Sequence, residues 1–164
     1  MELNKLQQED INRINVLITS EKNSRDFCEY DEESEAFVLR RVLTNAFPYF
    51  YGFVPKTHYN DGEPLDVMVL TNEPLKQGII VHVRPIGLIR LRGKIPDDIL
   101  IAVLLTDRNF EKTQDLLSLD ENEIERLKSF LAELKEKKFE DILGAAHARK
   151  AVKLSIELYR REFE

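Results

Sequence analysis

The chain has 164 residues, the length of one ordinary domain, with 43% hydrophobic and 33% charged residues. No stretch approaches the roughly 20 consecutive apolar residues of a membrane-spanning helix, so the composition excludes a protein of that kind. The formal net charge of −6 opposes non-specific nucleic-acid binding, which depends on Lys and Arg side chains that neutralise phosphates. We therefore expect one domain over residues 1–164, with neither a membrane nor nucleic acid as its partner.

The first residues of the chain and its single cysteine indicate the cellular compartment of the protein. The first nine residues lack the apolar core of a secretory signal peptide. Cys28 is the only cysteine, so no disulfide can form within the chain. Together these features predict a location in the reducing cytoplasm.

Short apolar runs rich in β-branched residues recur along the first two thirds of the chain, separated by Gly, Pro, Asn and Asp. They predict strands over residues 14–19, 36–43, 66–71, 79–91 and 99–105. Five or so strands of this length suit a small closed barrel.

The pattern then changes from strand to helix. Ser118 and Glu121 have the spacing of a capping box, and apolar residues follow at helical intervals from residue 124 to residue 134. Gly144 interrupts, and residues 148–163 predict a second amphipathic helix. Strands followed by helices predict an α+β fold, with the helices packed on the outside of the barrel.

An acidic turn precedes the strand predicted at residue 66. Asp61, Glu63 and Asp66 lie within six residues, and extended geometry would direct Asp61 and Glu63 to the same side. Carboxylate oxygens are the ligands that Mg²⁺ prefers, so the turn is a candidate metal site. The alternative is a polar turn whose Gly62 and Pro64 serve only the backbone.

Residues 47–53 contain a dense aromatic run, Phe47-Pro48-Tyr49-Phe50-Tyr51-Gly52-Phe53. Most of this run is expected in the core. A buried tyrosine needs a partner for its hydroxyl group, so projection of Tyr49 or Tyr51 into a cleft, to donate to an anion, stays open. The three histidines show no paired spacing that would indicate zinc.

Five segments in this order resemble soluble family I inorganic pyrophosphatases. They are Glu29-Tyr30-Asp31, Arg41-Val42-Leu43, Tyr51-Gly52-Phe53-Val54-Pro55, Asp61-Gly62-Glu63-Pro64-Leu65-Asp66-Val67 and Arg84-Pro85-Ile86-Gly87. The resemblance implies an OB-like five-stranded barrel with flanking helices and a cytosolic homo-oligomer. It also implies Mg²⁺-dependent hydrolysis of diphosphate to two phosphates.

The resemblance assigns roles residue by residue. Metal ligands are expected at Asp61, Asp66 and Asp97, with Asp98 in place of Asp97 if the alignment shifts by one residue. Substrate contacts are expected at Glu29, Arg41, Tyr51 and Lys135, the last three to phosphate oxygens. Glu63 stands where the family has an aspartate that helps to activate the attacking water, so Glu63 and Asp66 form the expected catalytic pair.

Several positions depart from the family pattern. Apolar residues replace polar ones at Ile18, Phe27, Ile99 and Leu134, two of them in place of phosphate-binding lysines, at Phe27 and Ile99. Loss of one preorganised donor commonly costs about 10²–10³ in rate. The loop over residues 91–96 is shortened and its charge is reversed. Arg92 and Lys94 would attract an anion there, or form a solvated basic turn.

These departures favour a catalytically impaired or inactive relative that keeps one Mg²⁺ site and part of a phosphate site. One alternative is an active Mg²⁺-dependent inorganic diphosphatase with compensating residues. Another is a structural or nucleic-acid-binding module built on the OB-like barrel. The expected partners are pyrophosphate or another phosphate-bearing small molecule, and further copies of the same chain.

Overall fold

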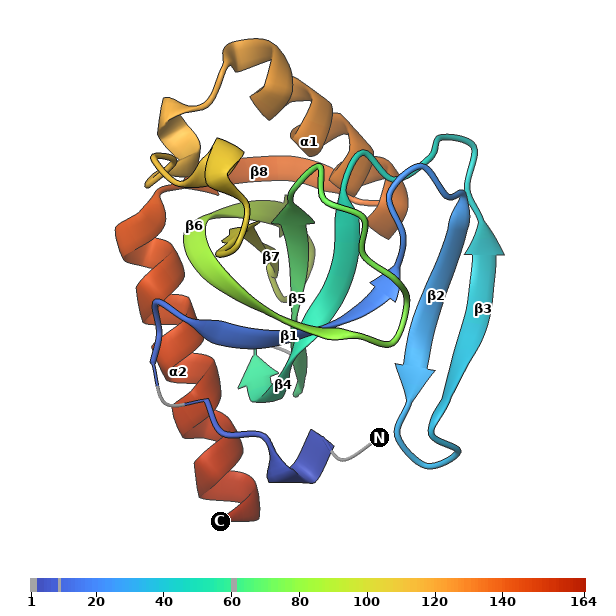
Figure 1. Cartoon of the computed structure of the whole chain (residues 1–164), viewed down its shortest axis with the longest axis vertical. Coiled ribbons are helices and arrows are strands. Elements are labelled where there is room, and N and C mark those ends of the chain that lie inside the picture. The colour runs from blue at the N-terminus through green and yellow to red at the C-terminus, as the bar shows by residue number, and fades with distance from the viewer. Residues whose placement is uncertain (1–2, 9, 60–61) are drawn as a thin grey trace.

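The computed structural model describes residues 3–8, 10–59 and 62–164. Five strands close a barrel in the order β1 (Ile14–Ser20), β4 (Phe50–Tyr59), β5 (Glu63–Leu70), β7 (Asp97–Leu104) and β6 (Ile80–Arg92), and β6 pairs back with β1 (Figure 1). β8 (Lys138–Leu143) pairs with β6 beyond the barrel, and β2 (Asp26–Asp31) and β3 (Ala36–Val42) form a separate hairpin. The predicted α+β fold with a five-stranded barrel is confirmed.

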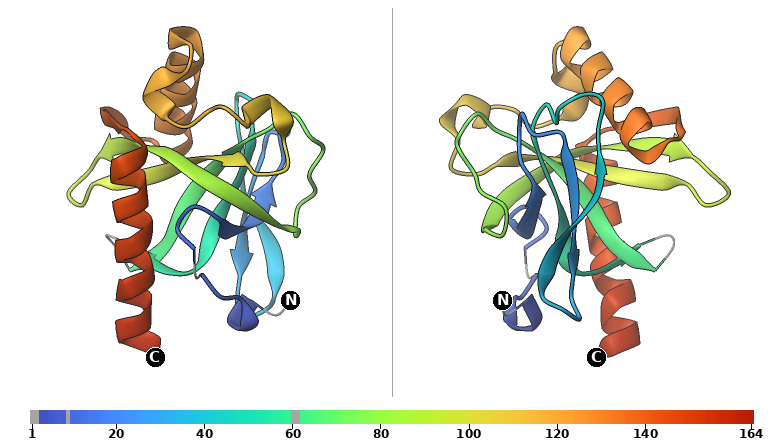
Figure 2. Two further views of the ribbon diagram at one scale, coloured as in Figure 1. Left: turned by 60° about the vertical axis from the view of Figure 1, so that its left-hand side comes forward. Right: turned by 90° about the vertical axis from the view of Figure 1, so that its right-hand side faces the viewer.

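The two α-helices lie outside the barrel, as Figure 2 shows. α1 (Glu121–Lys135) lies near one end, and α2 (Ala145–Phe163) runs along the side. Three short 3₁₀ turns complete the described elements: η1 (Leu3–Lys5), η2 (Arg108–Phe110) and η3 (Leu116–Ser118). In the described part of the chain, no helix has the length and apolar character needed to cross a membrane.

The sequence patterns missed three strands and misplaced one helix start. β2, β4 and β8 were not predicted, because their residues show neither an unbroken apolar run nor a clear alternation. The expected capping box is wrong: Ser118 lies in η3, and the side chain of Asp120 accepts the backbone N–H of Asn122 to cap α1. The second helix, predicted over residues 148–163, is confirmed as α2.

The barrel strands are buried on both faces. Val67 and Val69 belong to one core cluster, and Met68 and Leu70, the alternate residues of β5, belong to a second. One face of α2 packs into the first cluster and one face of α1 into the second. Burial on both faces explains why these strands appear in the sequence as continuous apolar runs.

β5 and β7 are the parallel pair of the barrel, with Val67 opposite Leu100. Parallel strands begin at the same end of a sheet, so Asp66 on β5 and Asp97 on β7 enter the barrel at one place. The fold therefore brings together acidic residues that lie 31 positions apart in the sequence.

Gly52 allows β1 and β4 to approach each other closely. A Cβ atom at this position would lie 1.9 Å from the carbonyl oxygen of Leu17, which is backbone and cannot rotate away. We predict that Gly52→Ala lowers the free energy of unfolding by about 3 kcal/mol or more, measured by chemical denaturation. The control is Gly93→Ala, whose new Cβ would come no closer than 3.0 Å to a neighbouring atom. Equal stability of the two variants would contradict this account of barrel closure.

Candidate functional site

A cleft of about 580 Å³ opens where β5 and β7 begin. The walls come from β4, β5, β7, the β2–β3 hairpin and the ends of both α-helices. The predicted site residues that line it are Glu29, Tyr51, Glu63, Asp66, Asp97 and Lys135, together with Asp98, the alternative to Asp97. Residues that are far apart in the sequence thus share one concave surface, the usual setting for a small-molecule site.

Asp66 is the centre of this arrangement. The hydroxyl group of Tyr51 donates a hydrogen bond to Asp66 Oδ2 at 3.1 Å, and Lys135 Nζ contacts the same oxygen at 2.5 Å. Tyr51 is 3% exposed, which settles the open alternative for this residue: its ring belongs to the core and its hydroxyl group faces the cleft. Tyr49 instead donates to Glu123, on α1.

The end of α1 positions Lys135. Glu136 adopts a left-handed backbone conformation with φ of 55°, so the helix stops at Lys135. A lysine in the last helical turn also interacts favourably with the helix dipole. The position at which α1 ends therefore places the ammonium group of Lys135 next to Asp66.

The electrostatic environment keeps Lys135 charged and Tyr51 neutral. Burial alone would lower the pKa of Lys135, but Tyr51, Asp66 and Asp97 together outweigh burial and raise it. Burial, reinforced by the charge of Asp66, raises the pKa of Tyr51 well above its ordinary value. At neutral pH the cleft therefore offers an ammonium group and a phenol, both of which are hydrogen-bond donors.

Asp97 and Asp98, adjacent at the start of β7, have different surroundings. Lys137 Nζ lies 3.2 Å from Asp97 Oδ2, and the Asp97 side chain is 23% exposed. The Asp98 side chain is fully enclosed: Arg90 Nε and Nη2 donate to it at 2.7 and 3.0 Å, and the Tyr59 hydroxyl group at 2.9 Å. Burial, together with Asp98, raises the pKa of Tyr59 to about 12. Both residues line the cleft, but the carboxylate of Asp98 is enclosed by Arg90 and Tyr59, whereas the side chain of Asp97 is partly exposed.

The remaining predicted residues are dispersed. Arg41 lies beside the cleft, where its guanidinium group contacts Glu136 and the carbonyl oxygen of Leu134. Arg92 lines a second cavity with Glu136, Lys137 and Lys138, and Lys94 is exposed and lines neither cavity. Asp61 lies outside the described residues.

Only one of the four apolar replacements lines the cleft. Ile18, Ile99 and Leu134 are at most 2% exposed and belong to the core clusters. Phe27 lines the cleft, with its ring 6.2 Å from that of Tyr51 and the guanidinium of Arg41 6.0 Å above it. Thr19, next to Ile18, also lines the cleft, and its hydroxyl group donates to the carbonyl oxygen of Tyr51. Among the four replacements, Phe27 is therefore the one that adds an apolar side chain to the cleft wall.

Sequence reasoning missed two contributors, Lys137 and Thr19. Lys137 follows the left-handed Glu136, and this change of direction carries its ammonium group to Asp97. A second lysine two positions after Lys135 was the available signal. Thr19 gave no such signal, because the sequence alone does not show which face of its strand turns toward the cleft.

The acidic residues of the cleft have the donor chemistry that suits Mg²⁺. Within residues 3–8, 10–59 and 62–164, no three His, Cys, Asp or Glu side chains cluster closely enough to define a metal centre. Asp66 and Asp97 nevertheless face the same cleft, and each is neutralised by a lysine. Each carboxylate has two oxygens, so it can accept a hard cation on one oxygen beside the lysine contact on the other.

Comparisons with known proteins agree with this fold. The inorganic pyrophosphatase family model matches residues 16–160. The inorganic pyrophosphatase of Saccharolobus solfataricus is 36% identical over 155 residues, covering 88% of this chain and 90% of the relative. The one from Nostoc sp. is 37% identical over 136 residues, with 80% of each chain covered.

Solved structures show the same likeness. The crystal structure of the inorganic pyrophosphatase from Thermus thermophilus has a TM-score of 0.88 and 29% identity, and covers 98% of this chain and 99% of the other. The fold and the site define a class of protein: a five-stranded barrel whose cleft carries both acidic and basic side chains. The chain belongs to the soluble family I inorganic pyrophosphatases.

The raised pKa of Lys135 predicts how stability depends on pH. A raised folded pKa means that the contribution of Lys135 is complete below its unfolded value, about 10.4, and is lost as the pH rises through the higher folded value. Lys135→Met should therefore lower the free energy of unfolding by about 2 kcal/mol, equally at about pH 7 and pH 9. Denaturant titrations at each pH check this. The prediction is contradicted if the difference in the free energy of unfolding between the parent protein and Lys135→Met is smaller at about pH 9 than at about pH 7.

Proposed function

We propose that this protein is a Mg²⁺-dependent inorganic diphosphatase that hydrolyses pyrophosphate to two phosphates. The observation that supports this proposal most strongly is the arrangement of Tyr51 and Lys135 on one carboxylate oxygen of Asp66, inside a cleft. Relatives with 31–37% identity are named inorganic pyrophosphatases. Those names favour the active alternative and give no support to the predicted loss of activity.

We assign the metal to the acidic side of the cleft. Asp66 and Asp97 would hold Mg²⁺, with Asp61 as a further expected ligand. Asp98 is a poor candidate, since Arg90 and Tyr59 already engage its enclosed carboxylate. Bound Mg²⁺ would supply Lewis-acid chemistry, polarising phosphoryl oxygens and balancing the charge of the anion.

The basic side of the cleft binds the substrate. The Lys135 ammonium has three N–H groups, so it can keep its contact with Asp66 and also donate to a phosphate oxygen. The Tyr51 hydroxyl group lies on the same side, and because it has a single O–H it would donate to a phosphate oxygen only on releasing Asp66. Fixed donors of this kind stabilise the charge that accumulates on the phosphoryl oxygens during transfer.

Glu63 serves as the proton acceptor. It is the first residue of β5, is exposed and lines the cleft. Its carboxylate takes a proton from water while the water oxygen attacks one phosphorus atom. The phosphoanhydride P–O bond then breaks, and the departing phosphate carries away the electron pair of that bond. The extra methylene of Glu63 shifts the base by about 1 Å from the family position, a displacement that can cost about a hundredfold in rate.

Phosphate release from pyrophosphate with saturating Mg²⁺ tests the proposal. The parent protein should release phosphate, and Asp66→Ala should reduce the rate by at least about a hundredfold. The variant also controls for pyrophosphatase carried over from the expression host. Equal release by the two proteins would mean that the chain does not catalyse this reaction.

Phe27 supports a second candidate, a protein that binds a phosphate-bearing ligand but turns it over slowly. This ring lies on the substrate wall, where the family resemblance places a phosphate-binding lysine. An apolar ring there excludes water but gives no charge to the phosphoryl group.

Replacing Phe27 separates the two candidates. We predict that Phe27→Lys raises kcat/KM for pyrophosphate about tenfold, because it adds a cation next to the phosphate site. Phe27→Leu is the matched control, since it keeps an apolar wall. A Phe27→Lys rate at or below that of Phe27→Leu would show that this position does not limit catalysis.

Other expectations from the sequence stay predictions. They concern anion binding by Arg92 and Lys94, self-association and a cytoplasmic location. A role as a structural or nucleic-acid-binding module has no specific contact in its favour.

A further inference from the structure

The cleft continues beyond the phosphate side into a region walled by aromatic rings. Tyr30 and Phe53 line it as a stacked pair, with ring centroids 6.4 Å apart and an interplanar angle of 23°. His58, Tyr159 and Phe163 line it as a second group of rings. We call these five residues the aromatic annexe. None of them has a part in the hydrolysis of inorganic pyrophosphate described above.

The α2 side of the aromatic annexe is preorganised. Tyr159 and Phe163 are one helical turn apart on α2, with ring centroids 4.7 Å apart. The His58 ring meets both edge-on, at 5.5 and 5.0 Å, and its Nδ1 lies 2.8 Å from Glu162 Oε2. Phe163 nevertheless remains 56% exposed. A large aromatic ring is thus held in place at the cleft with much of its surface uncovered.

Lys56 supplies a further cation to the cleft. Its backbone is left-handed, with φ of 59°, which is costly for a residue with a side chain. The strand is irregular between Val54 and Tyr59, and buried Thr57 holds this bulge by donating to the carbonyl oxygen of Val54 and accepting the N–H of Leu65. Bulges next to active sites commonly redirect a side chain.

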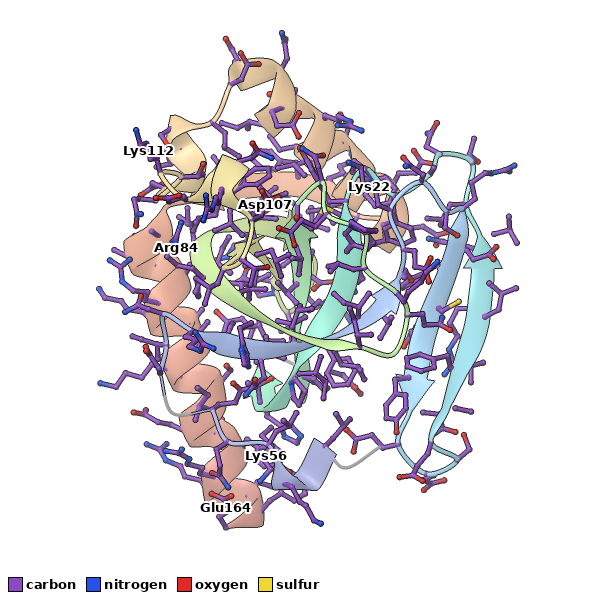
Figure 3. The ribbon with its side chains drawn as sticks, in the orientation of Figure 1. Lys22, Lys56, Arg84, Asp107, Lys112 and Glu164 are labelled. Atoms are coloured by element: carbon purple, nitrogen blue, oxygen red, sulfur yellow. The ribbon has the colours of Figure 1, made fainter. Side chains whose placement is uncertain are left out.

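Lys56 lines the cleft, and no acidic side chain pairs with it in the described part of the chain. Figure 3 shows Lys56 at the same end of the molecule as Glu164, the residue that follows α2. A strained bulge thus presents to the cleft an ammonium group that has no acidic partner among the described residues.

The size of the cleft agrees with a larger ligand. A volume of about 580 Å³ falls within the range of roughly 300–1,000 Å³ typical of sites for molecules much larger than pyrophosphate. Inorganic pyrophosphate has no apolar part and uses only the side with Asp66 and Lys135. The annexe offers flat apolar surface that this anion cannot contact.

We propose that the cleft binds nucleoside diphosphates, with the base stacked in the aromatic annexe and the diphosphate directed toward Lys135. Lys56 contacts the phosphate next to the ribose. The inference rests on the proposed function for the phosphate side, and it adds a substrate class to that site. Stacking of a base on aromatic side chains is sequence-tolerant, so adenine and guanine nucleotides should both bind.

Calorimetric titration with ADP and with pyrophosphate, each without Mg²⁺ so that pyrophosphate is not hydrolysed, tests the inference. Removing a stacked ring typically weakens binding by about five- to a hundredfold. Phe163→Ala should therefore raise the Kd for ADP by about tenfold more than the Kd for pyrophosphate. Lys56→Ala should also weaken ADP binding selectively. Leu154→Ala is the matched control, because it removes an exposed apolar side chain of α2 that does not line the cleft.

The outcomes separate this inference from the proposed function. Phosphate release that depends on Asp66, combined with no ADP binding or with equal effects of Phe163→Ala and Leu154→Ala on ADP, would overturn the annexe alone. ADP binding that Phe163→Ala weakens selectively, without any phosphate release, would support the annexe and refute the diphosphatase.

Discussion

The contact between Lys135 and Asp66 connects the two parts of the structure on which the site depends. It joins the last residue of α1 to a residue of β5, 69 positions earlier in the sequence. The Lys135 and Asp66 side chains are only 19% and 30% exposed, so either charge alone would be costly at this depth. Closing the barrel and ending α1 at Lys135 are therefore both conditions for this ion pair in the cleft.

Charge balance extends this principle across the cleft. Each acidic residue at the start of β7 has its own cation, Lys137 for Asp97 and Arg90 for Asp98. The two pairs differ in chemistry. Arg90 donates two hydrogen bonds to the enclosed Asp98 and so fixes its carboxylate. Lys137 makes one contact with Asp97 through a flexible side chain, which leaves Asp97 able to bind a ligand. The choice of Arg or Lys thus separates a structural acid from one that can serve a ligand.

Local patterns predicted the elements with the strongest periodicity. Strands buried on both faces and the amphipathic α2 were found, because burial alone determines their residues. β4 was missed because Gly52 and the bulge near Lys56 interrupt its pattern for reasons that only the folded barrel reveals. The sequence predicted a reversal of charge in the loop that contains Arg92 and Lys94. It did not reveal that both residues lie outside the cleft.

The site itself required more than periodicity. Asp66, Tyr51 and Lys135 were singled out together only through resemblance to a family, since no local rule links an acid on a strand with a lysine at a helix end. Residue-by-residue transfer also did not reveal that the side chains of Ile18 and Ile99 lie in the core and not on the cleft wall.

The central claim is that lysine-balanced carboxylates in this cleft hold a divalent cation. The most direct test is the thermal midpoint of unfolding as Mg²⁺ is increased, because a ligand that binds only the folded state must raise it. The account predicts a rise for the parent protein and for Glu140→Ala, an exposed acid outside the cleft, and none for Asp66→Ala. A midpoint that does not respond to Mg²⁺ in the parent, or that rises equally in Asp66→Ala, would contradict it.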